Sequence, residues 1–479
     1  MSSVFGATWL DLAYLVTGVL FILGLRFLSS PATARLGNRL AAIGMLLALV
    51  VTLVGTGIVS WWIIAIGIIV GGAIGWGSAR AVKMTAMPQM VALFNGAGGG
   101  AAALVSTAEF LKLENLAAGG IVGPAVPYDQ GVTIVLSAII GALSFAGSII
   151  AFLKLQELMT GRPITYPGQQ IVNGLVLVAI LAGAVAIIGT QGALPLPWIF
   201  WGMLAAALAL GVLFVLPIGG ADMPVIISLL NSFTGLAVAL TGLALSNNVL
   251  IIAGALVGAS GTLLTILMGK AMNRSLTNVL FGAFGAAPSG GAAAAAGSTP
   301  QNVRSTSIED VAMMLAYAHQ VVVVPGYGMA VAQAQHSVRE LADQLEKRGV
   351  EVKYAIHPVA GRMPGHMNVL LAEANVPYPQ LFDMEDINPE FARTDVALII
   401  GANDVTNPAA RNVTSSPIYG MPILDVDKAA NIIVLKRSMR SGFAGIDNPL
   451  YEDPKTAMLF GDAKASVDGL ASAVKQLGP

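Results

Sequence analysis

Long apolar segments, separated by short polar ones, fill the chain from its first residues to about residue 283, where the pattern changes. A helix needs about 20 apolar residues to cross the hydrocarbon core of a bilayer. The pattern predicts nine such membrane spans, at residues 8–26, 39–57, 59–79, 86–110, 132–154, 171–189, 194–216, 223–244 and 248–269. The first segment lacks the basic region and the cleavage site of a signal peptide, so we interpret it as a span.

Basic residues in the loops between the spans indicate the orientation, because cytoplasmic loops are enriched in Lys and Arg. Those that share one side are Arg26, Arg35, Arg39, Arg80, Lys83, Lys154, Arg162, Lys270 and Arg274. Lys112 alone falls on the other side. The bias predicts an N-terminus outside the cell and a cytoplasmic C-terminal part, which requires an odd number of spans.

Polar side chains inside the spans are candidates for a water or proton path, because a polar group in lipid must be hydrogen bonded or hydrated. Ser228, Asn231 and Ser232 follow helical spacing and form one polar patch on the eighth span. Asn95 lies within the fourth span, and Asp222 begins the eighth. Two alternatives stay open: the asparagines could join helices by hydrogen bonds, and Asp222 could cap its helix.

Small residues recur at helical spacing on several spans and predict close helix packing. The three stripes are Gly67, Gly71 and Gly75; Ser137, Gly141, Ser144 and Ser148; and Gly254 with Gly258.

Composition separates a charge-poor part from an ordinary one. Only 11% of the 479 residues are charged, against about 25% in soluble proteins. Residues 1–283 hold 10 of the 25 Lys and Arg and 6 of the 26 Asp and Glu. A net charge of −1 does not suggest nucleic acid binding. The chain has no cysteine, which excludes disulfides and cysteine-ligated metals, and its four histidines all follow residue 283, so no metal site is predicted.

The chain beyond the spans predicts a second domain. Residues 284–305, rich in Gly, Ala, Ser and Pro, are typical of a flexible linker between a membrane domain at 1–283 and a domain at 306–479. A capping box at 306–309 predicts a helix to about Tyr317. Strands are predicted at 321–324, 351–356, 396–401, 421–425, 431–435 and 457–460, and helices at 329–347, 366–375 and 463–477. This alternation favours an α/β, Rossmann-like, doubly wound parallel sheet.

A glycine-rich turn follows the first predicted strand and begins the next helix. Its candidate nucleotide-binding residues are Gly326, Tyr327, Gly328, Met329, Ala330 and Val331. The first glycine permits a tight turn, and the second permits close approach to a pyrophosphate at the helix N-terminus. Val331 stands where the fingerprint has Gly or Ala, so a purely structural turn is the alternative reading.

The residues at strand ends favour NADP over NAD. An NAD site usually has a carboxylate at the end of its second strand, where this chain has His357. Lys436, Arg437 and Ser438 instead follow the strand at 431–435, and two cations with a hydroxyl suit a 2′-phosphate. A solvated surface pair is the alternative.

Further strand-end loops complete the candidate cofactor site. The first contains Val359, Ala360, Gly361, Arg362, Met363, Pro364 and Gly365; the second contains Gly401, Ala402, Asn403 and Asp404; the third contains Asp462 and Ala463. Asp404 could bind a ligand or merely begin a turn, and Asp462 could equally be a helix N-cap. The sequence shows no nucleophile paired with a general base. Hydride transfer does not need such a pair, because it depends on the position and the electronic state of the cofactor.

Seven motifs extend over almost the whole chain: Gly219-Gly-Ala-Asp-Met-Pro224, Lys270-Ala-Met-Asn-Arg274-Ser, Pro325-Gly-Tyr-Gly-Met-Ala-Val-Ala-Gln333, His357-Pro-Val-Ala-Gly-Arg-Met-Pro-Gly-His-Met-Asn368, Gly401-Ala-Asn-Asp404, Lys436-Arg-Ser438 and Gly461-Asp-Ala-Lys464. Together they resemble the beta subunit of Re/Si-specific, proton-translocating NAD(P) transhydrogenases.

The resemblance implies a bacterial inner-membrane protein that works with an alpha subunit, which binds NAD(H), as a dimer of protomers in lipid. This chain would bind NADP(H) through the loops named above, and hydride would pass directly between the two nicotinamides without a catalytic side chain. Inward proton movement would drive NADPH formation. The resemblance assigns Asn231 and Asp222 to the proton path and its gate, with Arg274 near the domain junction.

One position departs from the family pattern. Many members have a histidine in the fourth span, in a stretch that begins Met-Thr-x-Met-Pro. Here Met84-Thr-Ala-Met-Pro88 leads to Asn95 at the corresponding position. Asparagine does not exchange a proton near neutral pH. The titrating group is therefore either water held by asparagines or a histidine of the partner subunit, and we favour the partner.

Two functions of other classes compete with this interpretation. A transporter or channel gated by a cytoplasmic nucleotide-sensing domain has the same architecture but transfers no hydride. A membrane reductase that uses NADPH would need a second substrate pocket at the membrane surface, and the loops contain no aromatic-rich segment that suggests one.

Overall fold

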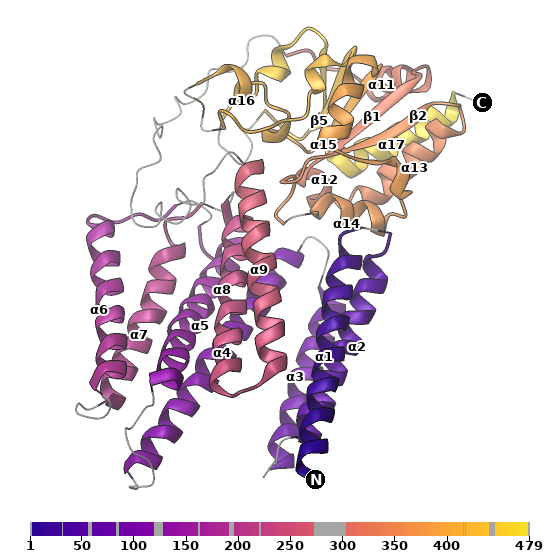
Figure 1. Cartoon of the computed structure of the whole chain (residues 1–479). Coiled ribbons are helices and arrows are strands. Elements are labelled where there is room, and N and C mark those ends of the chain that lie inside the picture. Colours follow the sequence, from indigo (N-terminus) through magenta and orange to yellow (C-terminus); the bar gives the residue numbers. More distant parts are fainter. Residues whose placement is uncertain are drawn as a thin grey trace. The chain divides into compact units, whose positions relative to one another are not determined.

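The structure, a computed structural model, has two compact units. Figure 1 shows a group of long helices, followed in the chain by an α/β unit. The described residues are 2–30, 32–55, 60–82, 86–118, 128–160, 163–190, 196–219, 222–272, 303–363, 365–414, 416, 418–439 and 446–477. Most of the predicted linker lies outside them, but its last residues hydrogen-bond with the α/β sheet through Arg304 O and Met458 N at 2.8 Å.

The long helices match the predicted spans. They are α1 (Ser2–Leu28), α2 (Ala34–Gly55), α3 (Trp61–Ala81), α4 (Met87–Ala118), α5 (Tyr128–Leu155), α6 (Gln169–Thr190), α7 (Leu196–Val215), α8 (Met223–Ala244) and α9 (Asn248–Ala271). Within the described residues, nine helices are long and apolar enough to cross a bilayer. The predicted membrane architecture is confirmed, and α4 extends furthest beyond its predicted end.

Helix α5 is the most buried span and packs against α4, α7 and α8. Its stripe of small residues is buried, and a Cβ added to Gly141 would come within 2.6 Å of the Gly99 carbonyl of α4. A Cβ on Gly254 of α9 would similarly come within 2.4 Å of Ala239 N in α8. These two stripes bring helix backbones into close contact, as predicted.

The stripe on α3 behaves differently. Added Cβ atoms at Gly67, Gly71 and Gly75 would meet nothing within 4 Å, and α3 has no buried residue. The predicted close packing at this stripe is therefore not seen within the described part of the chain.

The α/β unit is built on six parallel strands. They are β1 (Gln320–Pro325), β2 (Glu351–Ile356), β3 (Leu381–Asp383), β4 (Val396–Ile400), β5 (Asn431–Lys436) and β6 (Thr456–Phe460). Their order is β3-β2-β1-β4-β5-β6, and every neighbouring pair is parallel. The doubly wound parallel sheet is confirmed. Its central strands, β1 and β4, are buried along their whole length because both faces of the sheet are covered.

The strand predicted at 421–425 is wrong. Pro422 has no N–H to donate, and the neighbouring backbone groups bond elsewhere. Asn388 donates to the Ile423 carbonyl at 3.1 Å and accepts from Asp425 N at 3.0 Å. The segment is thus held by a side chain instead of a ladder. Strand β3, which the sequence did not reveal, has only three residues and so shows no alternation.

The helices of the α/β unit are α11 (Ile308–Ala316), α12 (Tyr327–Val331), α13 (Gln335–Glu346), α14 (His366–Glu373), α15 (Met384–Ile387), α16 (Ala409–Asn412) and α17 (Ala463–Gln476). The single helix predicted at 329–347 is two, because Gln333 has a left-handed φ of 53°. The cap of α11 is also one residue later than predicted. Ser307 accepts from Asp310 N, while Thr306 N bonds to Met458 O of β6.

Two layers of helices cover the sheet. Helices α11, α13 and α17 pack together on one face. Buried residues of the other face, including Val322, Ile399 and Val434, pack against Phe391, Leu424 and Tyr451. Figure 1 shows α15 and α17 on opposite sides of the sheet.

Candidate functional site

The predicted cofactor residues meet at one edge of the α/β unit. All six strands are parallel, so the loops after β1, β2, β4, β5 and β6 begin at the carboxyl edge of the sheet. The strand order reverses direction between β1 and β4. Ligands of doubly wound sheets bind in the crevice at such a switch point.

Two glycine-containing turns pack backbone against backbone at the switch point. Gly326 N donates to Ile400 O at 2.9 Å, and Gly328 N donates to Gly401 O at 2.9 Å. A Cβ on Gly326 would stand 2.3 Å from Ala402 N, and one on Gly401 would stand 2.4 Å from the Gly328 Cα. Gly401 also has a φ of +69°. The glycines are therefore required by the contact between the turns themselves, before any ligand is considered.

The turn after β1 and the loop after β2 meet through an aromatic side chain. The Arg362 guanidinium lies over the Tyr327 ring, 4.4 Å from its centroid. This cation–π contact places a guanidinium against the turn after β1. Helix α12, which begins at Tyr327, has only five residues, so the helix behind this turn is shorter than predicted.

Two buried histidines hold the loop after β2. His357 Nε2 donates to the Pro422 carbonyl at 2.9 Å, and its Nδ1 accepts from Val359 N at 3.2 Å. His366 Nδ1 accepts from Arg362 N at 3.1 Å. A ring that accepts at Nδ1 is neutral. These contacts fix the backbone on which Arg362 is carried, and sequence reasoning did not assign them.

Both histidines titrate below their usual range. Burial lowers the pKa of His357 to about 4, although the hydrogen bond to Pro422 acts in the opposite direction. Burial, then the charge of Arg362, lowers the pKa of His366 to about 4.

Stability of the α/β unit is expected to fall in acid. The unfolded chain takes up protons at these histidines near pH 6.5, and the folded chain only near pH 4. The free energy of unfolding is therefore greatest above pH 6.5 and decreases towards pH 4. His357 accounts for up to about 3 kcal/mol of this decrease. Native-state hydrogen exchange of β1 and β4 amides measures it. His357→Gln should flatten the profile and the exposed His336→Gln should not; equal profiles in all three proteins would contradict this.

Lys436 joins the ends of β4 and β5 through a buried tyrosine. Its Nζ lies 4.6 Å from the centroid of the Tyr451 ring and 3.5 Å from the hydroxyl. The Tyr451 hydroxyl donates to Asn403 Oδ1, and Asn403 Nδ2 donates to Asp404 Oδ1 at 3.1 Å. Burial lowers the pKa of Lys436, whereas the charges of Asp404 and Asp447 raise it. The ammonium is thus partly desolvated and held in place, which strengthens its interaction with an anion.

Residues after β5 complete this arrangement. Arg437 and Ser438 are exposed, so both are accessible to a ligand. Asn448 is buried and donates to the Asn403 carbonyl at 3.1 Å. Sequence reasoning missed Asn448 and Tyr451. Their only local signal is the turn Asn448-Pro-Leu, in which Asn448 accepts from Leu450 N.

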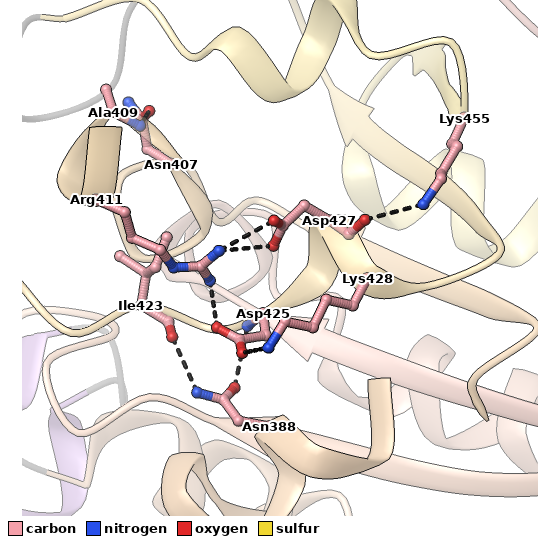
Figure 2. Close-up of polar contacts among 9 residues, drawn as sticks. All are labelled: Asn388, Asn407, Ala409, Arg411, Ile423, Asp425, Asp427, Lys428 and Lys455. Atoms are coloured by element: carbon pink, nitrogen blue, oxygen red, sulfur yellow. Dashed lines mark hydrogen bonds and ion pairs between the residues drawn. The ribbon is translucent and has the colours of Figure 1, made fainter. Parts of the chain in front are cut away.

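A cluster of charged side chains fixes the segment that follows Asp404 (Figure 2). Arg411 of α16 pairs with Asp425 and also donates to Asp427 at 3.0 and 3.2 Å. Lys428 pairs with the other oxygen of Asp425 at 2.5 Å, and Lys455 donates to the Asp427 carbonyl at 3.2 Å. We call these five residues the Arg411 cluster. It ties α16 to the 3-10 turn at Val426–Lys428, so the loop from β4 leads into a fixed segment.

Two predicted positions, Asp462 and Ala463, begin helix α17. Asp462 is the N-cap of α17, where its carboxylate accepts from Lys464 N at 3.0 Å and Ala465 N at 3.3 Å. The alternative reading of Asp462 as a cap is therefore confirmed, and Ala463 is the first residue of the helix. Pro364 lies outside the described residues.

The span residues form a second polar region, between α4, α5 and α8. Asn95 is buried and donates to Ser148 Oγ at 2.8 Å and towards Ser144 Oγ at 3.5 Å. Ser144 shares a hydrogen bond of 2.6 Å with Thr234, which donates to the Asn95 carbonyl at 3.4 Å. Asn95 Oδ1 has no hydrogen-bond partner among the described residues. Asn95 therefore joins three helices, as predicted by the alternative that asparagines connect helices through hydrogen bonds. Its Oδ1 atom could in addition accept a hydrogen bond from water.

Two residues of the predicted patch on α8 contact α9. Ser228 and Ser232 donate to the α9 carbonyls of Gly261 at 3.1 Å and Gly258 at 2.9 Å. Asn231 is half-buried, one turn before Thr234. Asp222 occupies the N-cap position of α8 but makes no side-chain capping hydrogen bond. Arg274 lies outside the described residues.

Comparisons with known proteins indicate the family of this chain. The family model described as NAD(P) transhydrogenase beta subunit matches residues 10–473. Two proteins from Rhodospirillum rubrum, each named NAD(P) transhydrogenase subunit beta, are 50% identical to this chain over 463 residues. The alignment covers 96% of this chain and 98% of each relative. The resemblance drawn from the motifs is confirmed, and the chain belongs to the NAD(P) transhydrogenase beta subunit family.

Proposed function

We propose that this chain binds NADP(H) at the carboxyl edge of its sheet and couples proton movement through α4, α5 and α8 to hydride transfer. The observation that carries the cofactor assignment is the end of β5. A half-buried lysine is followed there by an exposed arginine and serine, and no carboxylate follows β2 directly. This set suits a 2′-phosphate better than a free ribose hydroxyl.

The chain's own residues fit the cofactor in three places. Gly326 and Gly328 add no side chain at the switch point, so the backbone of this turn can be approached closely there. Tyr327 and Arg362 provide a stacked aromatic and cationic surface. Lys436, Arg437 and Ser438 provide donors for a phosphate, with Asn403 and Asp404 beside them. Bound NADP(H) would supply the hydride acceptor or donor, and these residues would orient it and limit access by water.

The remaining parts of the enzyme belong to a partner. We infer an alpha subunit that binds NAD(H), so that hydride passes directly and Re/Si-specifically between two nicotinamides. The proposed division is a proton-translocating domain at 1–283, a linker at 284–305 and an NADP(H)-binding domain at 306–479. The loop charges support a cytoplasmic NADP(H) domain. We further propose a bacterial inner-membrane location and a dimer of protomers in lipid.

Proton coupling requires a group that titrates near neutral pH, and Asn95 does not. Its bonds to Ser144, Ser148 and Thr234 nevertheless make it a suitable end point for water. We propose that a histidine of the partner subunit exchanges the proton, and that Asn95, Ser228 and Asn231 line its path, with Asp222 and Arg274 at the cytoplasmic end.

The expected size of the coupling is measurable. One charge that crosses 100 mV releases about 2.3 kcal/mol, and about 1.4 kcal/mol changes an equilibrium tenfold. One proton per hydride would therefore shift the product ratio roughly 40-fold per 100 mV.

Reconstitution with an alpha subunit in sealed liposomes tests the proposal. NADPH formation from NADH should accelerate when an inward pH difference is imposed, and should lose that response when an uncoupler is added. Hydride transfer that ignores the gradient would contradict the coupling. NADP(H) binding without hydride transfer would instead favour a transporter gated by nucleotide.

A further inference from the structure

Lys154, in the last turn of α5, lies in an unusual position for a charged residue. The loop-charge pattern treats it as a solvated cation beside the membrane, yet its exposed fraction is only 3%. Its Nζ donates to the backbone carbonyls of Val215 at 3.3 Å, Leu216 at 2.5 Å and Ile218 at 2.8 Å.

These three contacts use the full donor capacity of the ammonium group, which has three N–H bonds and no acceptor. The carbonyls stand at the end of α7, where the helix leaves its last acceptors unpaired and carries partial negative charge. Val215 O also accepts from Ile218 N at 3.2 Å, so Lys154 supplies additional donors, from a different helix, to this buried terminus.

The same carbonyls begin the connection to α8. Residues 216–222 lead from α7 to Asp222, and Asp222 N donates back to Gly219 O at 3.1 Å. Leu216 O also accepts from Ile164 N at 3.1 Å. Lys154 is therefore the side chain that ties this connection to the end of α5, the helix whose Ser144 and Ser148 bind Asn95.

We propose that Lys154 is a positioning residue for proton coupling: it holds the α7–α8 connection, and with it Asp222, in register with the polar region around Asn95. The inference rests on the proposed function, in which Asp222 stands at the cytoplasmic end of the path. Lys154 itself carries no proton in this proposal. It acts through the connection, which loses its three hydrogen bonds to α5 when the ammonium group is removed.

Lys154→Met tests the proposal because methionine keeps the length of the side chain and removes all three donors. The complex with an alpha subunit is reconstituted in liposomes, and protons moved per hydride are measured. This ratio is expected to fall, because the connection that leads to Asp222 loses its three hydrogen bonds from Lys154. Hydride transfer in the detergent-solubilised complex should persist. Lys154→Arg, which keeps the charge with a different donor geometry, should fall less.

A labelling measurement reads the connection directly. The chain has no cysteine, and a Cβ at Gly219 would meet only Pro163, at 3.6 and 3.7 Å, which is ordinary contact. Gly219→Cys is therefore labelled with a maleimide in the solubilised complex, with and without Lys154→Met. Faster labelling in the double variant is expected, because the connection is released.

Lys112 is the matched control. It is an exposed lysine that pairs with Glu109 at 2.9 Å on the same helical unit, so Lys112→Met should change neither measurement. The inference would be overturned if the wild-type complex couples proton movement to hydride transfer and the Lys154→Met complex moves as many protons per hydride. A wild-type complex that does not couple would instead refute the proposed function. If Lys154→Met does not accumulate, Lys154→Arg decides: a lowered ratio supports the inference, and a wild-type ratio overturns it.

Discussion

Replacing Lys436 with alanine is expected to weaken NADP(H) binding about 100-fold, because truncating one partner of a buried, charged contact costs about 2–5 kcal/mol. Lys436 is held at the end of β5 by Tyr451, which itself bonds to Asn403 after β4. The substitution removes the cation proposed to bind the 2′-phosphate and leaves the sheet intact. Calorimetric titration of the solubilised protein with NADP+ measures the loss.

The specificity of this effect distinguishes a phosphate contact from general damage. The weak affinity of the same site for NAD+, which lacks the 2′-phosphate, should change little in Lys436→Ala. Lys475→Ala, at an exposed position near the end of α17, should bind both nucleotides as the wild type does. An equal loss for both nucleotides would show that Lys436 supports the site without contacting the phosphate.

Replacing Gly401 with alanine is expected to destabilise the α/β unit by about 3 kcal/mol or more and to abolish stable NADP(H) binding. Two costs combine. The left-handed φ of +69° disfavours any side chain, and the new Cβ would stand 2.4 Å from the Gly328 Cα. The turns after β1 and β4 would have to separate, which opens the switch point. Native-state hydrogen exchange of β1 and β4 measures the destabilisation.

Gly349 separates the two costs. It also has a left-handed φ, of +86°, but an added Cβ would meet nothing within 4 Å. Gly349→Ala should therefore show only the backbone strain, about 1–2 kcal/mol, with NADP(H) affinity retained. If the two variants were equally stable, the close contact between the turns would not contribute to the site.

The parts of this protein that the sequence predicted correctly are those with a repeated local pattern. A span must satisfy its backbone within one apolar helix, so length and composition revealed all nine candidate spans in the described chain. Buried parallel strands are continuous apolar runs, so β1, β4 and β5 were found within one or two residues. The same pattern led to the error at 421–425, where Pro422 makes an apolar run unsuitable for a ladder.

The rest depends on contacts between distant residues, which leave no local signal. Tyr451 lies 48 positions from Asn403 and bonds to it only because β4 and β5 are neighbours. Lys154 was counted among solvated loop charges because its acceptors lie 61 to 64 positions further along the chain. The assignment of cofactor residues from strand ends was possible since a doubly wound sheet brings those ends together whatever the intervening sequence.

The Arg411 cluster (Figure 2) has a practical consequence for nucleotide titrations. Its ion pairs are only partly buried, and dissolved salt screens such pairs over a Debye length of about 8 Å at physiological ionic strength. Salt also screens the attraction between Lys436 and a phosphate. Higher salt is therefore expected to lower the affinity for NADP(H) in two ways: it loosens the segment after β4, and it weakens the contact between Lys436 and the phosphate. An Arg411→Ala protein, titrated at several salt concentrations beside the wild type, separates the two contributions.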